Sequence, residues 1–231
     1  MTSRPEARSP ASPPCLAAEI APDYFDPLAV EPQQATDVMR WRKAQRSSLL
    51  AARAAISSSA RAAIATAIAH GLDRLLEELF PDLTGKVISG YWPIKSEPDL
   101  RFWLGSLSAR GAQAALPVVE TIARPLIFRP WHPGAPMIRG HWNILVPEST
   151  AEADPDFMLA PLVGWQSEGY RLGYGGGYFD RTLAACRARG RKPVVVGVGL
   201  SSAKLATIFP QPHDIAMDYI ITETGQVGPL R

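Results

Sequence analysis

The sequence contains no long uninterrupted run of apolar residues. Over its 231 residues, no stretch approaches the roughly 18 apolar residues that a membrane-spanning helix needs. The N-terminus is rich in proline, serine and charged residues, so it lacks the apolar core of a secretory signal. We therefore expect a cytoplasmic protein with no membrane partner.

Cysteine is also scarce, and the histidines are scattered. Cys15 and Cys186 lie far apart in the chain, which excludes a disulfide framework or a cysteine metal cluster. The four histidines do not have metal-site spacing, and no Ser-His-Asp or Cys-His arrangement is evident. Covalent catalysis by a protein nucleophile is therefore not indicated, and His213 is predicted to be structural.

The net charge of +2 is small and unevenly distributed. Residues 1–35 carry two arginines against five acidic residues, a net charge of −3, which leaves +5 for the rest of the chain. The sequence has no runs of lysine and arginine. This modestly basic body suits small anionic ligands and argues against nucleic acid as a partner.

The first 35 residues differ in composition from the rest. They contain seven prolines and no sustained apolar period, so they cannot bury enough surface to offset chain entropy. We predict a disordered or loosely docked tail, either a dispensable extension or a regulatory or interface segment. Residues 36–231 are predicted to form a single domain.

The most informative stretch is residues 169–181, in which five of thirteen residues are glycine. Glycine-rich backbone can turn its N–H groups toward one point, and a helix that follows adds its positive end, so phosphate is the usual ligand. The spacing fits neither the Walker A motif nor the dinucleotide fingerprint. Arg171 before the loop offers a forked donor for phosphate, and Asp180 after it offers an oxygen ligand for Mg²⁺. ATP with Mg²⁺ is the simplest interpretation.

Apolar periodicity predicts an α/β order of elements around this loop. Helices are expected at 36–55, 58–79, 99–111 and 178–189, and strands at 87–91, 112–119, 125–130, 156–163, 193–200 and 219–222. Strand, glycine loop, helix and strand in succession form a βαβ unit. The loop is therefore expected at the carboxyl edge of a parallel pair of strands.

Charged residues on two other elements could belong to the same site. Arg42, Arg46 and Arg53 fall along one edge of the first helix, with Lys43 beside them, either as solvated side chains or as a basic rail for polyphosphate. Glu97 follows a strand end, where ligands gather in α/β sheets, but it could also be a first-turn acid that favours the helix dipole. For Asp99 we favour the helix-start role.

Two further residues leave alternatives open. Trp142 lies between turn-rich segments, as a core or lid residue or as a platform for a ligand. Asp214 is a second candidate ligand for Mg²⁺.

The residues Gly169-x-Arg171-Leu172-Gly173-x-Gly175-x-Gly177-Tyr178-x-Asp180 resemble the signature of the 5-formyltetrahydrofolate cyclo-ligases, also called methenyltetrahydrofolate synthetases. The resemblance covers about residues 36–224 and includes the basic first helix, Glu97, Trp142-Asn143-Ile144 with Pro147, Pro161, and His213-Asp214. It implies a single α/β domain with a mixed, mainly parallel sheet flanked by helices, similar to the sugar-isomerase and CoA-transferase-like group.

The resemblance also implies a reaction and its ligands. The expected reaction is the ATP-driven, Mg²⁺-dependent conversion of 5-formyltetrahydrofolate, with or without a polyglutamate chain, to 5,10-methenyltetrahydrofolate. ADP and phosphate would be released after a phosphorylated formyl intermediate. The expected enzyme is a monomer, with an oligomer left open as the alternative.

The resemblance assigns roles to individual residues. Arg171 and Tyr178 are expected to be catalytic, and Asp180 and Asp214 to hold Mg²⁺. Trp92, Glu97, Trp142 and Tyr174 are expected to bind the folate. ATP is expected to contact Arg42, Lys43, Arg46, Arg171, Leu172, Gly173, Tyr174, Gly175, Gly176, Gly177, Tyr178 and Phe179.

The chain departs from the family pattern in some places. Phe179 stands where the family usually has a second tyrosine, which removes a hydroxyl and keeps the ring. The first helix offers Arg42-Lys43 where a lysine is typical, so either side chain could reach the phosphates.

Two other functions remain open from the sequence. One is an ATP-dependent ligase that acts on another formamide or a carboxylate metabolite, and the other is a folate- or nucleotide-binding regulator without turnover. If Arg171 and Asp180 act only in the chemistry, replacing either by alanine should reduce turnover and leave stability nearly unchanged.

Overall fold

The computed structural model describes residues 32–230 of the chain. Most of the predicted tail, residues 1–31, lies outside the described residues. Its last four positions, 32–35, belong to the first helix, so the predicted start at residue 36 is too late. Proline is tolerated at a first helical position, because the N–H that it lacks has no partner within the helix there.

The helices are close to those predicted. None of the helices within residues 32–230 is long and apolar enough to cross a membrane. They are α1 (Pro32–Ala54), α2 (Ser58–Leu79), α3 (Arg101–Ser106) and α4 (Tyr178–Ala188), with short 3-10 helices at η3 (Leu107–Arg110), η4 (His141–Asn143) and η5 (Ser201–Ala203).

The helix predicted from residue 99 begins two residues later, as α3. The carboxylate of Asp99 accepts bonds from the backbone N–H of Arg101, at 3.1 Å, and from its guanidinium, at 2.6 Å. Asp99 thus lies one residue before the N-cap, Leu100, and outside the first turn in which we expected it, but its carboxylate binds the N–H of the first helical residue.

A seven-stranded sheet forms the centre of the molecule, in the order β11-β10-β9-β6-β1-β2-β3. The pairs from β10 through β2 are parallel, and the two edge strands, β11 and β3, are antiparallel to their neighbours. The sheet is therefore mixed and mainly parallel, as predicted. Its strands are β1 (Val87–Ser89), β2 (Gln113–Val118), β3 (Ile127–Pro130), β6 (Phe157–Pro161), β9 (Val194–Val198), β10 (Tyr219–Thr222) and β11 (Gly225–Val227).

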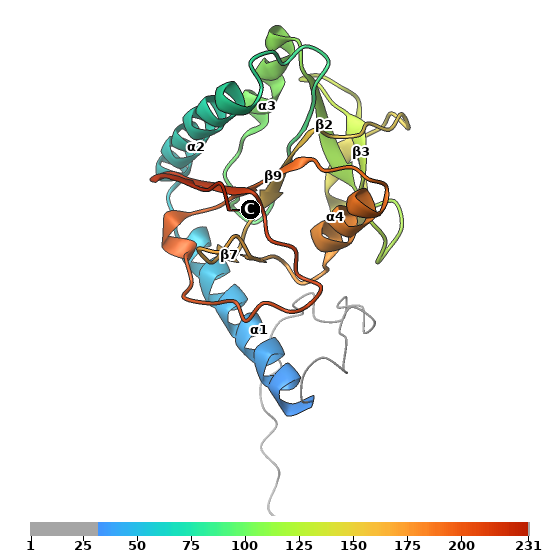
Figure 1. Cartoon of the computed structure of the whole chain (residues 1–231). Coiled ribbons are helices and arrows are strands. Elements are labelled where there is room, and N and C mark those ends of the chain that lie inside the picture. The colour runs from blue at the N-terminus through green and yellow to red at the C-terminus, as the bar shows by residue number, and fades with distance from the viewer. Residues whose placement is uncertain (1–31, 231) are drawn as a thin grey trace, which may run out of the picture.

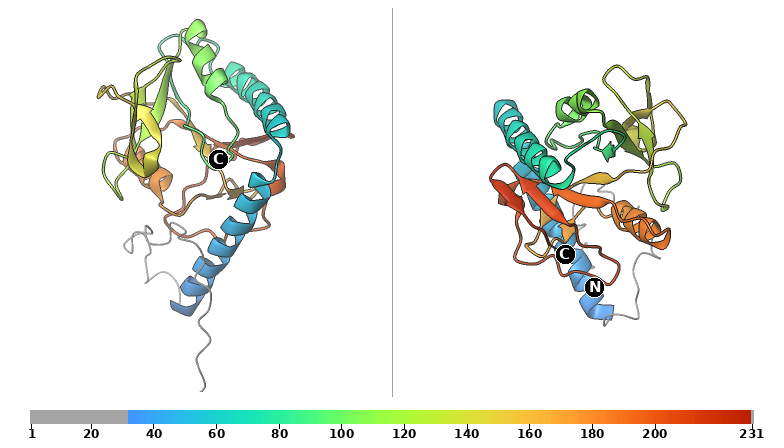
Figure 2. Two further views of the ribbon diagram at one scale, coloured as in Figure 1. Left: turned by 180° about the vertical axis from the view of Figure 1, so that it is seen from behind. Right: turned by 45° about the horizontal axis from the view of Figure 1, so that its top comes forward.

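Helices cover both faces of this sheet, with α2 and α3 on one face and α4 on the other (Figures 1 and 2). Side chains along each strand alternate between the two cores. Phe157 and Leu159 of β6 face the core with α2 and α3, whereas Met158 and Ala160 face the core with α4. Burial on both faces explains why the central strands are continuously apolar in the sequence.

The predicted βαβ unit is confirmed, because β6 and β9 are parallel neighbours and α4 lies between them in the chain. One detail was missed. A small antiparallel hairpin of β7 (Gly164–Trp165) and β8 (Arg171–Leu172) separates β6 from the glycine loop. Strands of two residues are too short to produce a period in the sequence.

A second hairpin stands beside the main sheet. It pairs β4 (Met137–Arg139) with β5 (Leu145–Pro147), and η4 forms its turn. Trp142 lies in this turn with a φ of 52°.

Candidate functional site

The site lies where the parallel strands end. Because β1, β6 and β9 run in the same direction, the segments that follow them meet at one edge of the sheet. The segment after β1 leads to Glu97. Arg53, near the end of α1, donates to the carbonyl of Leu162, directly after β6, at 3.0 Å. The end of α1 is therefore fixed to this edge.

The glycine loop, residues 173–177, connects β8 to α4. Gly175 and Gly177 have backbone φ values of 107° and 64°, which residues other than glycine rarely adopt. A Cβ on Gly176 would lie 2.7 Å from the ring of Tyr178. Gly177 is the N-cap of α4 and has no side chain with which to cap it. The backbone N–H groups at the start of α4 are thus oriented as an anion site requires.

Arg46 binds the glycine loop from α1. Its Nε donates to the carbonyl of Gly173 at 2.6 Å, and its guanidinium lies 3.7 Å from the Cβ position of Gly175. Lys43, one turn earlier, is exposed. The structure therefore brings the basic helix to the glycine loop.

Arg42 is part of a partly buried ion pair. Its Nη2 lies 2.5 Å from Asp214 Oδ2, and its Nε donates to the carbonyl of Ile208 at 2.8 Å. The same carboxylate oxygen of Asp214 accepts from the N–H of Gln211 at 2.7 Å. Arg42 and Asp214 thus join α1 to the loop before β10.

Arg171 and Asp180, predicted for phosphate and Mg²⁺, also bind each other. Arg171 Nη2 lies 2.6 Å from Asp180 Oδ1, and only 5% and 13% of these side chains are exposed. Both also bind the backbone of Ile215, whose N–H donates to Asp180 at 2.9 Å and whose carbonyl accepts from Arg171 at 3.0 Å. The ring of Phe179 lies 5.7 Å from the Arg171 guanidinium, so the ring contact does not need a tyrosine.

The two predicted metal ligands approach the same short segment. Asp180 binds the N–H of Ile215, which follows Asp214 in the chain. His213 Nε2 lies 3.9 Å from Asp214 Oδ1. Burial lowers the pKa of His213, and the nearby Asp214 and Asp180 partly oppose that shift.

A metal held by protein groups alone is not indicated at this segment. Among residues 32–230, no group of three or more His, Cys, Asp or Glu side chains is placed to hold an ion. Each of the two carboxylates has one oxygen in its arginine pair and a second oxygen outside it. The donors fit Mg²⁺ as oxygen ligands, provided that water and phosphate supply the rest of its shell.

Glu97 is buried, with only 5% of its surface exposed, and both of its oxygens accept hydrogen bonds. Tyr174 in the glycine loop donates its hydroxyl to Oε1 at 2.7 Å, and the N–H of Ile94 donates to Oε2 at 2.9 Å. Burial raises the pKa of Glu97, while these two bonds and the charges of Arg53 and Lys95 oppose the rise. A carboxylate at this edge is thus directly bonded to the predicted phosphate loop.

The predicted aromatic walls occupy two different places. Trp142 is 38% exposed, and its ring meets that of Tyr178 edge-on at 5.3 Å. The hydroxyl of Tyr178 accepts from the N–H of Ala123 at 3.3 Å. The ring of Trp92 lies 4.4 Å from the Arg101 guanidinium, at the start of α3. The structure therefore places Trp142 in direct contact with a residue of the glycine motif, and Trp92 beside the start of α3.

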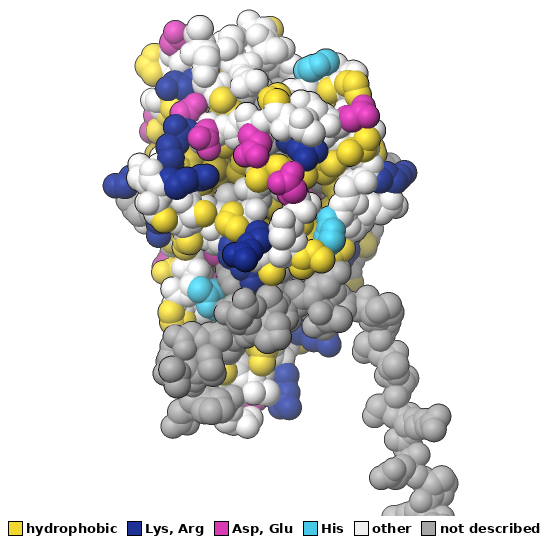
Figure 3. Space-filling model, turned by 90° about the vertical axis from the view of Figure 1, so that its right-hand side faces the viewer, with side chains coloured by type: hydrophobic (Ala, Val, Ile, Leu, Met, Phe, Trp, Pro, Cys, Tyr) yellow, Lys and Arg dark blue, Asp and Glu magenta, His cyan; other side chains and the backbone are white. Residues whose placement is uncertain are grey.

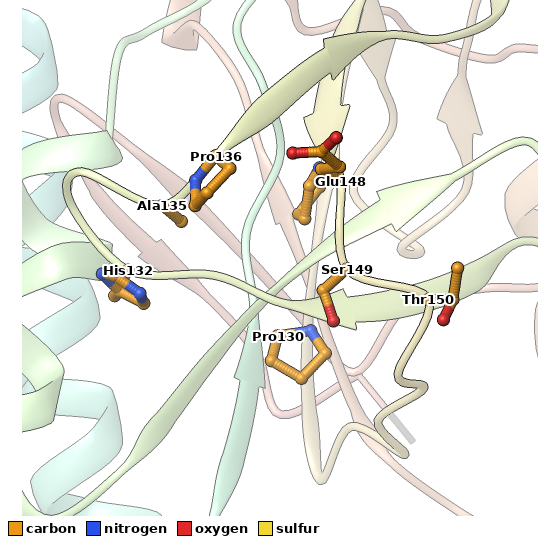
Figure 4. A pocket seen from close by; sticks show the side chains of 8 residues that line it. Pro130, His132, Ala135, Pro136, Glu148, Ser149 and Thr150 are labelled. Carbon is orange, nitrogen blue, oxygen red and sulfur yellow. The ribbon is translucent and has the colours of Figure 1, made fainter.

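Two cavities lie near these elements. One, of about 150 Å³, is lined by Arg53 together with residues of α1 and of the segments after β6 and β9. The other, of about 610 Å³, is open and contains none of the predicted site residues (Figure 4). It is lined by Pro130, His132, Ala135, Pro136, Pro147, Glu148, Ser149 and Thr150. Because the bonded contacts gather elsewhere, we place the site at the glycine loop.

Figure 3 views the molecule from the side on which α4 and β3 lie in Figure 1, and shows acidic and basic side chains mixed with apolar ones on this face. A nucleic-acid interface needs a basic stripe, which this view does not show.

Comparison with known proteins gives this geometry a family. The family model described as the 5-formyltetrahydrofolate cyclo-ligase family matches residues 38–223. The chain belongs to this family. A 5-formyltetrahydrofolate cyclo-ligase of Mycolicibacterium smegmatis is 29% identical over 197 residues, which cover 80% of this chain and 95% of that protein. One of Mycoplasma pneumoniae is 30% identical over 151 residues, which cover 65% and 80%.

Solved structures of the cyclo-ligase family have the same fold. The 5,10-methenyltetrahydrofolate synthetase of Aquifex aeolicus aligns with a TM-score of 0.67 at 28% identity, covering 82% of this chain and 93% of that one. The synthetase of Mycoplasma pneumoniae aligns with a TM-score of 0.61 at 27% identity, covering 79% and 98%. The predicted fold and the prediction of an enzyme of the cyclo-ligase family are thus confirmed.

We placed Arg53 in the basic rail of the first helix, but no ligand contact was assigned to it from the sequence. Its side chain is buried and donates to Tyr174 Oη at 2.6 Å and to the carbonyl of Lys95 at 3.0 Å. The sequence pointed to this location, because Arg53 follows Arg46 by two helical turns and so lies on the same face of α1.

Proposed function

We propose that this protein converts 5-formyltetrahydrofolate to 5,10-methenyltetrahydrofolate and hydrolyses ATP to ADP and phosphate in the process. Membership of the cyclo-ligase family and the names of its relatives support the folate conversion. The observation that carries the proposal is the hydrogen bond between Tyr174 and Glu97, at 2.7 Å. It joins the phosphate loop to the carboxylate expected to bind folate, so a γ-phosphate and a formyl group bound there would be neighbours.

The chemistry explains why ATP is needed. A formamide oxygen is a poor leaving group, and phosphorylation makes it a good one. We propose that the formyl oxygen attacks the γ-phosphorus and displaces ADP, which gives an N5-iminium phosphate. N10 then attacks the activated carbon, loses its proton, and the oxygen leaves as phosphate. Such a reaction asks the protein chiefly for positioning and charge neutralisation.

The triphosphate would be bound by the glycine loop and α1. The N–H groups at the start of α4 and the side chains of Arg46 and Lys43 would hold its oxygens. Arg171 is fixed by Asp180 and Ile215 at 2.6 and 3.0 Å, so it would meet the developing charge in a set orientation. We propose Arg171 and Tyr178 as the residues that contact the transferring group.

Magnesium would be held by Asp180 and Asp214 together with phosphate oxygens. When bound, it would neutralise charge on the phosphates. Each carboxylate has a second oxygen outside its arginine pair, which supports this assignment, because the arginine already orients the carboxylate.

Folate would bind against the carboxylate of Glu97. A carboxylate can accept paired hydrogen bonds from the pterin ring, and the aromatic side chains of Trp142, Tyr174 and Trp92 would supply apolar walls. Burial of Glu97 favours such bonds, since few waters compete for its oxygens.

The proposal is tested by mixing purified protein with ATP, Mg²⁺ and 5-formyltetrahydrofolate. Growth of the methenyl chromophore with one ADP released per product is expected. Omission of ATP is the control, and a simple N-formyl amino acid in place of the folate tests other formamides. Folded protein that produces no chromophore would refute the proposal, and ADP release with the simple formamide would assign another acceptor.

A further inference from the structure

We propose that Arg53 is a positioning residue that holds the carboxylate of Glu97 in its folate-binding orientation through the hydroxyl of Tyr174. This inference rests on the proposed function, because it assigns a task to a residue that would touch neither substrate. The two hydrogen bonds of the relay, at 2.6 and 2.7 Å, connect three separate parts of the chain.

Arg53 is fixed by its own contacts. Its side chain is buried, with 4% of its surface exposed. Two of its nitrogens donate to backbone carbonyls, Nε to Lys95 and Nη1 to Leu162, each at 3.0 Å. The third, Nη2, donates to Tyr174 Oη. A planar guanidinium bound at two carbonyls has little freedom left, so its third donor is aimed in one direction.

Tyr174 then transmits this orientation. Because its oxygen accepts from Arg53, its single O–H is left to donate to Glu97 Oε1 at 2.7 Å. The ring is flanked by two cations, with Lys95 Nζ 5.1 Å and the Arg53 guanidinium 6.0 Å from its centre. Without Arg53 the hydroxyl could rotate away, and Glu97 would keep only the bond from Ile94.

The backbone before Glu97 shows that its placement is demanding. Lys95 and Ser96 have backbone φ values of 46° and 62°, in the left-handed region that residues other than glycine seldom adopt. The carbonyl of Lys95 is the one that accepts from Arg53. Arg53 therefore fixes the strained turn and, through Tyr174, the carboxylate that the turn presents.

Side chains of α1 thus bind two consecutive residues of the glycine loop. Arg46 binds the carbonyl of Gly173, and Arg53 binds the hydroxyl of Tyr174. One helix would set both the phosphate loop and the folate carboxylate. The effect of losing Arg53 is therefore expected on folate binding, through Tyr174, and much less on ATP.

The first test uses Tyr174→Phe and Arg53→Lys, which keep the ring and the charge. Loss of a hydrogen bond to a charged group should lower kcat/KM for 5-formyltetrahydrofolate roughly 10- to 100-fold, while the KM for ATP changes little. Arg40→Lys is the matched control on α1, because Arg40 is 74% exposed in its side chain and pairs only weakly, at 3.6 Å, with Asp37. Its kinetics should equal those of the wild type.

A double-mutant cycle separates positioning from mere stability. If Arg53 acts through the tyrosine hydroxyl, Arg53→Lys in the Tyr174→Phe background should reduce kcat/KM by no more than about twofold further. Equal effects of Arg53→Lys in both backgrounds would overturn the proposal and leave Arg53 as a structural residue. If Arg53→Lys does not fold, Tyr174→Phe alone decides, since an unchanged kcat/KM in that variant also overturns it.

The pH profile gives a second readout. The charged groups that face Glu97 are Arg53 from α1 and Lys95 on its own segment, and the phenols are Tyr174 and Tyr91. Arg53 and the bond from Tyr174 both lower the pKa of Glu97. Tyr174→Phe should therefore move the acid limb of kcat/KM for folate to higher pH, and an unmoved limb counts against the relay.

Equilibrium binding distinguishes failure of this inference from failure of the proposed function. Binding of 5-formyltetrahydrofolate alone is followed by tryptophan fluorescence. A wild type that binds folate without forming product, with weaker binding in both variants, refutes the proposed function and supports the relay. A wild type that forms product, with binding unchanged in both variants, refutes the relay and leaves the proposed function standing.

Discussion

The ion pair between Arg171 and Asp180 leads to a quantitative prediction about stability. The pair is 2.6 Å long, and only 5% and 13% of the two side chains are exposed. Arg171→Ala leaves a carboxylate that is only 13% exposed and, among residues 32–230, keeps a single bond, from the N–H of Ile215. Breaking a buried pair in this way costs about 3–5 kcal/mol. We therefore expect Tm to fall by roughly 6–20 °C for a chain of this size.

This expectation replaces the one from the sequence, which assigned both residues to chemistry and predicted nearly unchanged stability. Sequence pattern alone does not show that two candidate ligands bind each other. Turnover should also fall by orders of magnitude, but a loss of stability of this size means that activity must be measured well below the Tm of the variant.

The assay is thermal unfolding followed by circular dichroism, with Arg110→Ala as the matched control. Arg110 pairs with Asp73 at 2.9 Å, but 34% and 39% of their side chains are exposed. Asp73 keeps a bond from the Trp103 indole after the change, as Asp180 keeps one from Ile215. The partly exposed pair should contribute less than about 1 kcal/mol.

The double variant Arg171→Ala with Asp180→Ala completes the test. Removing both charges should cost less than the sum of the single changes, because no uncompensated charge remains. If Arg171→Ala lowers Tm no more than Arg110→Ala does, burial is not what gives this pair its strength, and the reasoning is wrong.

Three further predictions concern the rest of the site. Burial raises the pKa of Glu97, so the contribution of this side chain to stability falls as pH rises from 4.5, the pKa of an unperturbed glutamate, through the higher pKa of the folded state. The Tm of Glu97→Gln minus that of the wild type should therefore increase from acid to neutral pH. A decrease in this difference would contradict the argument. Lys43→Ala should raise the KM for ATP and leave Tm unchanged, whereas Arg42→Ala should raise this KM and also lower Tm. Equal Tm values for the two variants would show that the ion pair of Arg42 with Asp214 contributes nothing to stability. Trp142→Ala should raise the KM for folate and lower the free energy of unfolding by under about 1 kcal/mol, since the ring is 38% exposed and meets the rings of Tyr178 and His141 edge-on. Unfolding of the variant at room temperature would assign Trp142 to the core.

The fold was predictable because its signals are local and regular. Continuous apolar runs at β6 and β9 indicated strands buried on both faces, and the glycine loop with α4 between them indicated a parallel pair. The β7–β8 hairpin was missed, since two-residue strands carry no period. Helix starts shifted by two to four residues, where capping and proline geometry decide.

The residues named from the sequence remain a prediction of the site, whereas the bonds between them could not be predicted. The sequence named Glu97 and Tyr174, and their spacing in the chain contains nothing that predicts a bond of 2.7 Å. The pairs Arg42–Asp214 and Arg171–Asp180 depend on how loops fold back onto α1 and α4. Those distances follow from tertiary packing over more than one element, which periodicity does not describe.

The bonds explain how these arginines can be held at the candidate site without a bound anion. Arg42 and Arg171 each face a carboxylate, and Arg46 and Arg53 each face a backbone carbonyl, so like charges are separated by acceptors. Because these side chains are already oriented, phosphate would not have to order them at the moment of binding. Preorganised donors stabilise developing charge more than mobile ones, since no reorganisation is needed during the reaction. The same bonds that orient the arginines also stabilise the fold. We therefore expect substitutions in the pairs Arg42–Asp214 and Arg171–Asp180 to reduce both stability and turnover.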